Sequence, residues 1–139
     1  MLPRLDYGDF MGLFSISHHT IDTIDWNGGN SSLQSFSLDC PVVTLPTAFM
    51  RGRHTVAMLE VLELPELIAQ DGEDYVAISS RLLSDEAFYQ EMRAKIAERK
   101  ERLFHDKSVA EAFQLAVETI CRQVPAVGQQ PIEILPLAA

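Results

Sequence analysis

Short apolar runs alternate along this chain with segments of helical periodicity, and this alternation constrains the fold more than any other feature. Three runs have the length of strands: Thr20–Ile24, Pro41–Leu45 and Leu67–Ala69. The second is almost continuously apolar, which is typical of a parallel strand buried on both faces. Strands that alternate with helices are joined by right-handed crossovers into a parallel sheet. The sequence therefore predicts an α/β, three-layer Rossmann-like fold with a short parallel sheet of about three strands, followed by C-terminal helices.

Apolar residues at intervals of three and four predict the helices that accompany these strands. The expected helices are Asp6–Ser17, Leu33–Leu38, Gly52–Leu62, one that opens at Asp71–Asp74, one that Ser84 caps and that ends near Arg102, and Ser108–Arg122. Beyond the last of them the chain contains Pro125, Pro131 and Pro136, which favour an extended segment. We therefore expect one partial domain over residues 1–123 and a Pro-containing C-terminal tail over residues 124–139.

The charge of the chain argues against one class of partner. Its 139 residues carry 20 acidic and 11 basic side chains, a net charge of −9. Nucleic-acid binding needs a basic stripe, so we expect no nucleic-acid partner. No apolar run approaches the roughly 18–20 residues that span a bilayer, and the first residues lack the layout of a signal peptide. We therefore expect a cytoplasmic protein without a membrane partner. The four histidines and two cysteines show no ligand spacing, so we expect no metal site and no bound cofactor.

The segment Asn27–Ser32 is the strongest candidate for a ligand site. It contains two adjacent glycines, follows the first strand and opens a helix. Glycines let the backbone approach a ligand closely, and a helix N-terminus offers unpaired N–H groups and partial positive charge. Open α/β sheets bind ligands at the carboxyl ends of their strands, where this segment lies. These properties favour a pyrophosphate cradle, although a tight turn with Asn30 or Ser31 as the helix cap explains the same residues.

A second signal is the pair Arg51 and Arg53. Together with Arg4 they are the only basic residues among the first 80. They stand at the start of an expected helix, where the helix dipole disfavours positive charge unless an anion is near. Pairing with Asp22 or Asp25 is the alternative explanation. Because both loops follow parallel strands, they emerge at the same edge of the sheet, and together they favour phosphate binding.

At these residues the sequence resembles the C-terminal catalytic lobe of the O-GlcNAc transferase/SPINDLY family. The resemblance rests on Ile21 to Thr23, Trp26 to Leu33, Pro41 to Pro46 and Phe49 to His54, and it continues through Glu66 to Ala69, Asp74 to Ile78, and Leu103 with Phe104. It covers the chain from about Leu2 to Gln123. It implies a GT-B glycosyltransferase with a protein acceptor and a nucleotide-sugar donor, a UDP-sugar first and a GDP-sugar as the alternative.

The resemblance also implies roles for individual residues. The segment Asn27–Ser32 matches the part of the family that holds the donor's phosphates, and Gln34 matches a position that usually carries an acidic residue for the ribose hydroxyls. An amide still hydrogen-bonds a diol, but without the charge assistance of a carboxylate. The expected donor- and phosphate-binding residues are Asn27, Gly28, Gly29, Asn30, Ser31, Ser32, Gln34, Arg51 and Arg53. No residue is assigned as the catalytic base.

Further parts implied by the resemblance lie outside these 139 residues: an N-terminal lobe, TPR repeats that bind acceptors, and the first half of the lobe's sheet. We therefore expect the donor-binding part of a hexosyl- or N-acetylglucosaminyltransferase that is inactive alone. The alternative is a truncated α/β interaction module without catalysis, which Gln34 favours. A strand at Thr20–Ile24 without its neighbour leaves an open edge, so we also expect a homo-oligomer.

Overall fold

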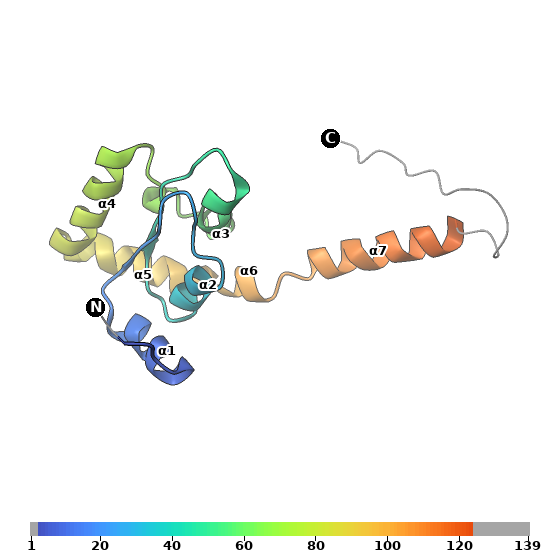
Figure 1. Cartoon of the computed structure of the whole chain (residues 1–139), viewed down its shortest axis with the longest axis horizontal. Coiled ribbons are helices and arrows are strands. Elements are labelled where there is room, and N and C mark those ends of the chain that lie inside the picture. The colour runs from blue at the N-terminus through green and yellow to red at the C-terminus, as the bar shows by residue number, and fades with distance from the viewer. Residues whose placement is uncertain (1–2, 124–139) are drawn as a thin grey trace. The chain divides into compact units, whose positions relative to one another are not determined.

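The computed structural model describes residues 3–123 and confirms an α/β fold, in which helices predominate (Figure 1). The chain divides into two units, Met1–His105 and Asp106–Ala139. The first contains α1 (Tyr7–Ile16), β1 (Thr20–Ile21), α2 (Asn30–Ser37), β2 (Val42–Val43), η1 (Met50–Gly52), α3 (His54–Val61), η2 (Pro65–Leu67), α4 (Gly72–Ser84), α5 (Glu86–Arg99) and α6 (Glu101–Phe104). The second contains α7 (Ser108–Gln123), and the predicted tail 124–139 lies outside the described residues.

The sheet is smaller than the sequence predicts. Strand β1 pairs in parallel with β2, with Thr20 opposite Val42. The prediction of about three strands is wrong for the described residues, because the third apolar run supplies only an isolated parallel bridge between Thr44 and Ile68. The 3-10 helix η2 begins at Pro65 and ends at Leu67, directly before Ile68. Just after the bridge, the N–H of Gln70 bonds to the Asp74 carboxylate at 2.9 Å, so the ladder extends in neither direction.

The predicted helices are present, but their boundaries differ. Helix α2 begins at Asn30, three residues before the expected start, and α3 begins at His54 after the short helix η1. Asp85, and not Ser84, caps α5, because its carboxylate accepts the N–H of Phe88 at 3.0 Å. The helix expected to reach Arg102 is interrupted after Arg99, and α6 follows as a separate turn.

The hydrophobic core of the first unit lies between the helices and the short sheet. Helix α5 packs against α2 and α4, and both of these contact β2 (Figure 1). The side chains that α5 contributes at every fourth position, Phe88, Met92 and Ile96, are buried as their spacing predicts. The buried cluster consists of Phe36, Val42, Val43, Leu59, Leu62, Leu64, Leu67, Leu82, Phe88, Tyr89, Met92 and Ile96.

Helices α2 and α3 end in the same way. Each is followed by an acidic residue in the left-handed conformation, Asp39 with φ 60° and Glu63 with φ 54°. The next N–H then bonds to a carbonyl five residues back, at 3.0 Å after α2 and at 2.9 Å after α3. This is the Schellman pattern of helix termination, with an acidic residue at the position where glycine is usual.

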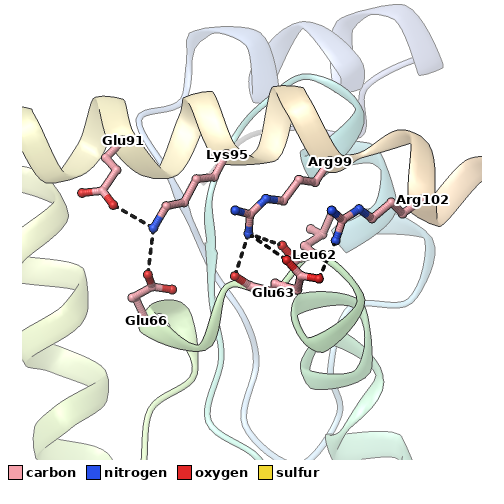
Figure 2. A network of polar contacts seen from close by, with 7 residues as sticks. All are labelled: Leu62, Glu63, Glu66, Glu91, Lys95, Arg99 and Arg102. Atoms are coloured by element: carbon pink, nitrogen blue, oxygen red, sulfur yellow. Dashed lines mark hydrogen bonds and ion pairs between the residues drawn. The ribbon is translucent and has the colours of Figure 1, made fainter.

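Basic side chains at the end of α5 hold both of these helix ends. The ammonium of Lys100 donates to the Ser37 carbonyl at 3.0 Å and to the Asp39 carboxylate at 2.7 Å. Arg99 donates to the carbonyls of Leu62 and Glu63 at 3.0 and 2.9 Å (Figure 2). A cation at a helix C-terminus complements the negative end of the helix dipole. Helix α5 therefore fixes α2 and α3 by their C-termini and leaves their N-termini for the candidate site.

Candidate functional site

The loop that follows β1 is closed by its own hydrogen bonds. The hydroxyl of Thr23 donates to the carbonyl of Trp26, and the Asn27 amide donates to the carbonyl of Thr23 at 2.9 Å. Asp25 lies between them with φ 68°, in the left-handed region that Asp and Asn tolerate best after glycine. Asn27 itself is buried, whereas the indole of Trp26 is 71% exposed. The loop is thus a defined turn that delivers the chain to Gly28.

Asp22 links this loop to the sheet. Its carboxylate is buried and accepts the N–H of Gly28 at 2.7 Å through one oxygen and the hydroxyl of Thr44 at 2.9 Å through the other. The hydroxyl of Tyr75 from α4 donates to the Asp22 backbone carbonyl. Burial, and then the charge of Asp22, raise the pKa of the Tyr75 phenol above its usual value. These contacts join the end of β1, the end of β2 and α4 at one point.

The N-terminus of α2 has free donors. Gly29 is the N-cap and has no side chain to bond the first turn. Within the described residues the N–H groups of Gly29, Asn30, Ser31 and Ser32 have no acceptor. A Cβ on Gly28 would lie 2.5 Å from the Ser31 hydroxyl, 2.6 Å from the Ser32 hydroxyl and 3.3 Å from the Ser32 nitrogen. The Ser31 hydroxyl and the Ser32 N–H therefore lie beside the face of Gly28 that lacks a side chain, as donors do at anion-binding helix N-termini, whereas the Ser32 hydroxyl bonds to Thr55.

The two loops predicted to meet at one edge of the sheet do meet. The N–H of Asn27 donates to the carbonyl of Arg51 at 2.8 Å. The hydroxyl of Thr55, in the first turn of α3, lies 3.3 Å from the carbonyl of Gly28 and 2.9 Å from the Ser32 hydroxyl. The first turns of α2 and α3 are therefore in direct contact.

The two arginines differ in their surroundings. Arg51 donates from Nε to the Asp25 carbonyl at 3.2 Å and lies over the rings of Phe49 and Trp26, at 4.7 and 6.0 Å from the ring centres. Arg53 is the N-cap of α3 and is exposed. Its guanidinium makes no hydrogen bond or ion pair with any described residue, so its charge is available to a ligand. The alternative that either arginine pairs with the carboxylate of Asp22 or Asp25 is not what the described contacts show.

Arg53 borders an open groove beside α3. The groove has a volume of about 700 Å³ and is lined mainly by apolar side chains, among them Met50, Val56, Met58 and Leu103. The glycine loop is not part of its lining. The two loops therefore meet through their backbones and through Thr55. The Arg53 side chain lies apart from this contact, at the groove beside α3.

The remaining predicted residues occupy the first turns of α2. Asn30 is exposed, Ser31 is half-buried and Ser32 is buried against Thr55. The side chain of Gln34 is half-buried and forms no hydrogen bond with the described residues. Among the described residues no hydrogen bond links it to Arg51 or Arg53.

Three residues that organise the site are not among those predicted from the sequence: Asp22, Thr44 and Thr55. Asp22 is an acidic residue in the middle of the predicted strand Thr20–Ile24, which is a recognisable signal. Thr44 stands inside an apolar run and Thr55 inside a helix, where a threonine is unremarkable. Only the folded contacts reveal those two.

The described residues hold no group of three or more His, Cys, Asp or Glu side chains placed to bind a metal ion. Among the helices of residues 3–123, none has the length and apolar character needed to cross a membrane.

Comparison with known proteins identifies the class to which this fold and site belong. The sequence model of glycosyl transferase family 41 matches residues 15–113. An O-GlcNAc transferase mutant from Thermobaculum terrenum superposes with a TM-score of 0.68 and 26% identity, over 87% of this chain and 22% of that one. The chain belongs to glycosyl transferase family 41.

Curated relatives agree with this assignment. A UDP-N-acetylglucosamine–peptide N-acetylglucosaminyltransferase of Caenorhabditis elegans is 33% identical over 76 residues, which are 55% of this chain and 7% of that protein. The protein of the same name from Giardia intestinalis is 28% identical over 97 residues, 70% of this chain and 7% of its own length. The probable enzyme SPINDLY of Hordeum vulgare is 26% identical over 99 residues, 70% and 10% respectively. The chain thus spans a tenth or less of the curated relatives it matches.

Proposed function

We propose that this chain is the part of a GT-B glycosyltransferase that binds the diphosphate of a nucleotide-sugar donor. One observation carries the proposal: at the N-terminus of α2 the N–H groups of Gly29 to Ser32 are unpaired among the described residues, and the Ser31 hydroxyl lies beside them. Partial positive charge at that terminus suits a diphosphate. Arg53 stands two residues after Arg51, whose carbonyl accepts the Asn27 N–H, and its guanidinium has no partner among the described residues, so we propose that its charge reaches the diphosphate.

The donor we propose is UDP-N-acetylglucosamine, because the names of the curated relatives specify it. In this arrangement Asn27–Ser32 hold the diphosphate, Gln34 lies one turn further along α2 to reach the ribose hydroxyls, and a protein is the acceptor. A GDP-sugar is the alternative donor. No described residue is proposed as the catalytic base.

Calorimetric titration of the 139-residue chain tests the proposal. UDP should bind measurably and uridine should not, because the diphosphate supplies the contacts. Arg53→Ala should weaken UDP binding by about 1.5–3 kcal/mol, the scale of a hydrogen bond to a charged group. The matched control is Arg81→Ala, since Arg81 lies on α4, is exposed and pairs with Asp85, the residue that follows this helix. Equal affinities for UDP and uridine would refute a diphosphate site.

Sugar transfer requires more than this site. We propose that the complete enzyme transfers N-acetylglucosamine to protein and that the 139-residue chain does not, because it spans only 22% of the related O-GlcNAc transferase structure. Turnover of UDP-N-acetylglucosamine by the purified chain would contradict this. The side of β1 that is unpaired among the described residues, where Ile21 is 58% exposed, further favours self-association of the chain.

A further inference from the structure

The peptide groups of Gly28 are held on both sides by buried side chains. Its N–H bonds to the Asp22 carboxylate at 2.7 Å, and its carbonyl lies 3.3 Å from the Thr55 hydroxyl. Asp22 is 6% exposed and Thr55 is fully buried. Neither belongs to the predicted phosphate-binding set, and neither presents a free group to the surface.

Each of these side chains is itself fixed. The second carboxylate oxygen of Asp22 accepts the Thr44 hydroxyl at 2.9 Å, and the Asp22 backbone bonds to Val43 at 3.0 Å and to the Tyr75 hydroxyl. The hydroxyl of Thr55 also contacts that of Ser32 at 2.9 Å. Buried polar networks in which every member is paired hold a single conformation, because each alternative leaves a donor or an acceptor unsatisfied.

Gly28 directly precedes Gly29, the N-cap of α2, so the orientation of its peptides sets the direction in which the first N–H groups of the helix point. From these contacts we propose that Asp22 and Thr55 are positioning residues that pre-form the diphosphate cradle by clamping Gly28. The inference rests on the proposed function of this loop. It adds that nucleotide affinity depends on two side chains that do not touch the nucleotide.

A buried carboxylate close to a diphosphate is electrostatically unfavourable unless hydrogen bonds from other groups stabilise its charge. Here both oxygens of Asp22 are taken by an N–H and a hydroxyl, so hydrogen-bond geometry, and not net charge, explains the residue. An asparagine keeps one oxygen to accept the Gly28 N–H, and its amide can donate to the Thr44 hydroxyl. An alanine leaves both partners buried without a bond. The clamp therefore predicts that Asn, but not Ala, replaces Asp22.

The test compares the UDP affinity of the 139-residue chain with that of four variants, Asp22→Asn, Asp22→Ala, Thr55→Ser and Thr55→Val. The Ala and Val variants should bind UDP about tenfold more weakly or worse, the scale of a lost bond to a buried partner. The Asn and Ser variants should stay within about threefold of the parent, because they keep the bonding groups. Asp9→Ala, an exposed site on α1, is the control for loss of a carboxylate.

The amide resonance and hydrogen exchange of Gly28 without nucleotide supply a readout of the clamp itself. The Gly28 amide should be protected in the parent and in Asp22→Asn, and should exchange faster in Asp22→Ala. Parent-like UDP affinity in folded Asp22→Ala or Thr55→Val would overturn the positioning role alone. An Asn variant as weak as the Ala variant would also overturn it, because charge would then be the cause. If the parent chain binds no UDP, the proposed function falls and this inference falls with it.

Discussion

At the scale of single residues, two adjacent glycines of the candidate site have different surroundings. A Cβ on Gly28 meets two hydroxyls and a backbone nitrogen, whereas a Cβ on Gly29 meets nothing within 4 Å. Gly28→Ala should therefore lower the free energy of unfolding by about 1–3 kcal/mol, as overpacking does, and should abolish UDP binding. Gly29→Ala should change stability by about 0.5 kcal/mol or less. Urea denaturation of both variants measures the difference, and equal stabilities would mean that the Ser31 and Ser32 hydroxyls simply rotate away.

His19 provides a pH-dependent prediction at the same scale. Its Nε2 is buried and has no hydrogen-bond partner among residues 3–123. Burial, followed by the charge of His18, lowers the pKa of His19 below 6.5. The unfolded chain therefore binds a proton at a higher pH than the folded chain does. The contribution of His19 to stability is complete above pH 6.5 and is lost as the pH falls through the lowered value.

Denaturation of the parent between pH 7.5 and pH 5 should show this loss, and His19→Gln should show a smaller one. His54→Gln, which changes an exposed imidazole on α3, is the control and should follow the parent. A parent and a His19→Gln variant with identical pH profiles would rule out the buried neutral imidazole.

At the scale of the elements, α5 holds the C-terminal ends of the two helices whose N-termini form the site. Arg99 bonds two carbonyls at the end of α3, while Arg102 only pairs with the exposed Glu63 carboxylate (Figure 2). Arg99→Ala should lower the free energy of unfolding by about 2 kcal/mol, because two acceptors lose a charged donor. Arg102→Ala should cost about 0.5 kcal/mol, as for a surface ion pair. Thermal or chemical denaturation in which the two variants behave alike would contradict the capping role of Arg99.

Comparison of the predicted with the observed elements shows which features sequence patterns can predict and which they cannot. The four-residue spacing in α5 predicts its buried face, because one helix face must meet the core whatever its neighbours are. The prediction of a third strand at Leu67–Ala69 is wrong, since three apolar residues do not reveal that the first of them belongs to a helical turn that starts at Pro65. The glycine loop is recognisable from composition and position. Its anchors Thr44 and Thr55 are not, because their role comes from contacts between residues more than twenty positions apart.

At the scale of the whole molecule, the short sheet leaves one side of β1 unpaired among the described residues. Thr20 and Asp22 direct their N–H groups to the β2 segment, so the N–H of Ile21 points to the other side. We expect the chain to self-associate at micromolar concentration through this edge. Sedimentation equilibrium should give twice the 15.6 kDa of the chain, or more. Ile21→Lys should shift it to monomer, whereas Val76→Lys on exposed α4 should not. A parent chain that stays monomeric at micromolar concentrations would disprove the edge as an interface.

The proposed function depends above all on where a nucleotide diphosphate contacts the chain. An amide NMR titration of the 139-residue chain with UDP, with uridine as the reference ligand, measures this directly. UDP, but not uridine, should produce saturable shifts of the amides of Gly29, Asn30, Ser31 and Ser32, accompanied by shifts at Arg53. Shifts confined to α5, or shifts in the glycine loop that uridine reproduces equally, would contradict a diphosphate site at the N-terminus of α2.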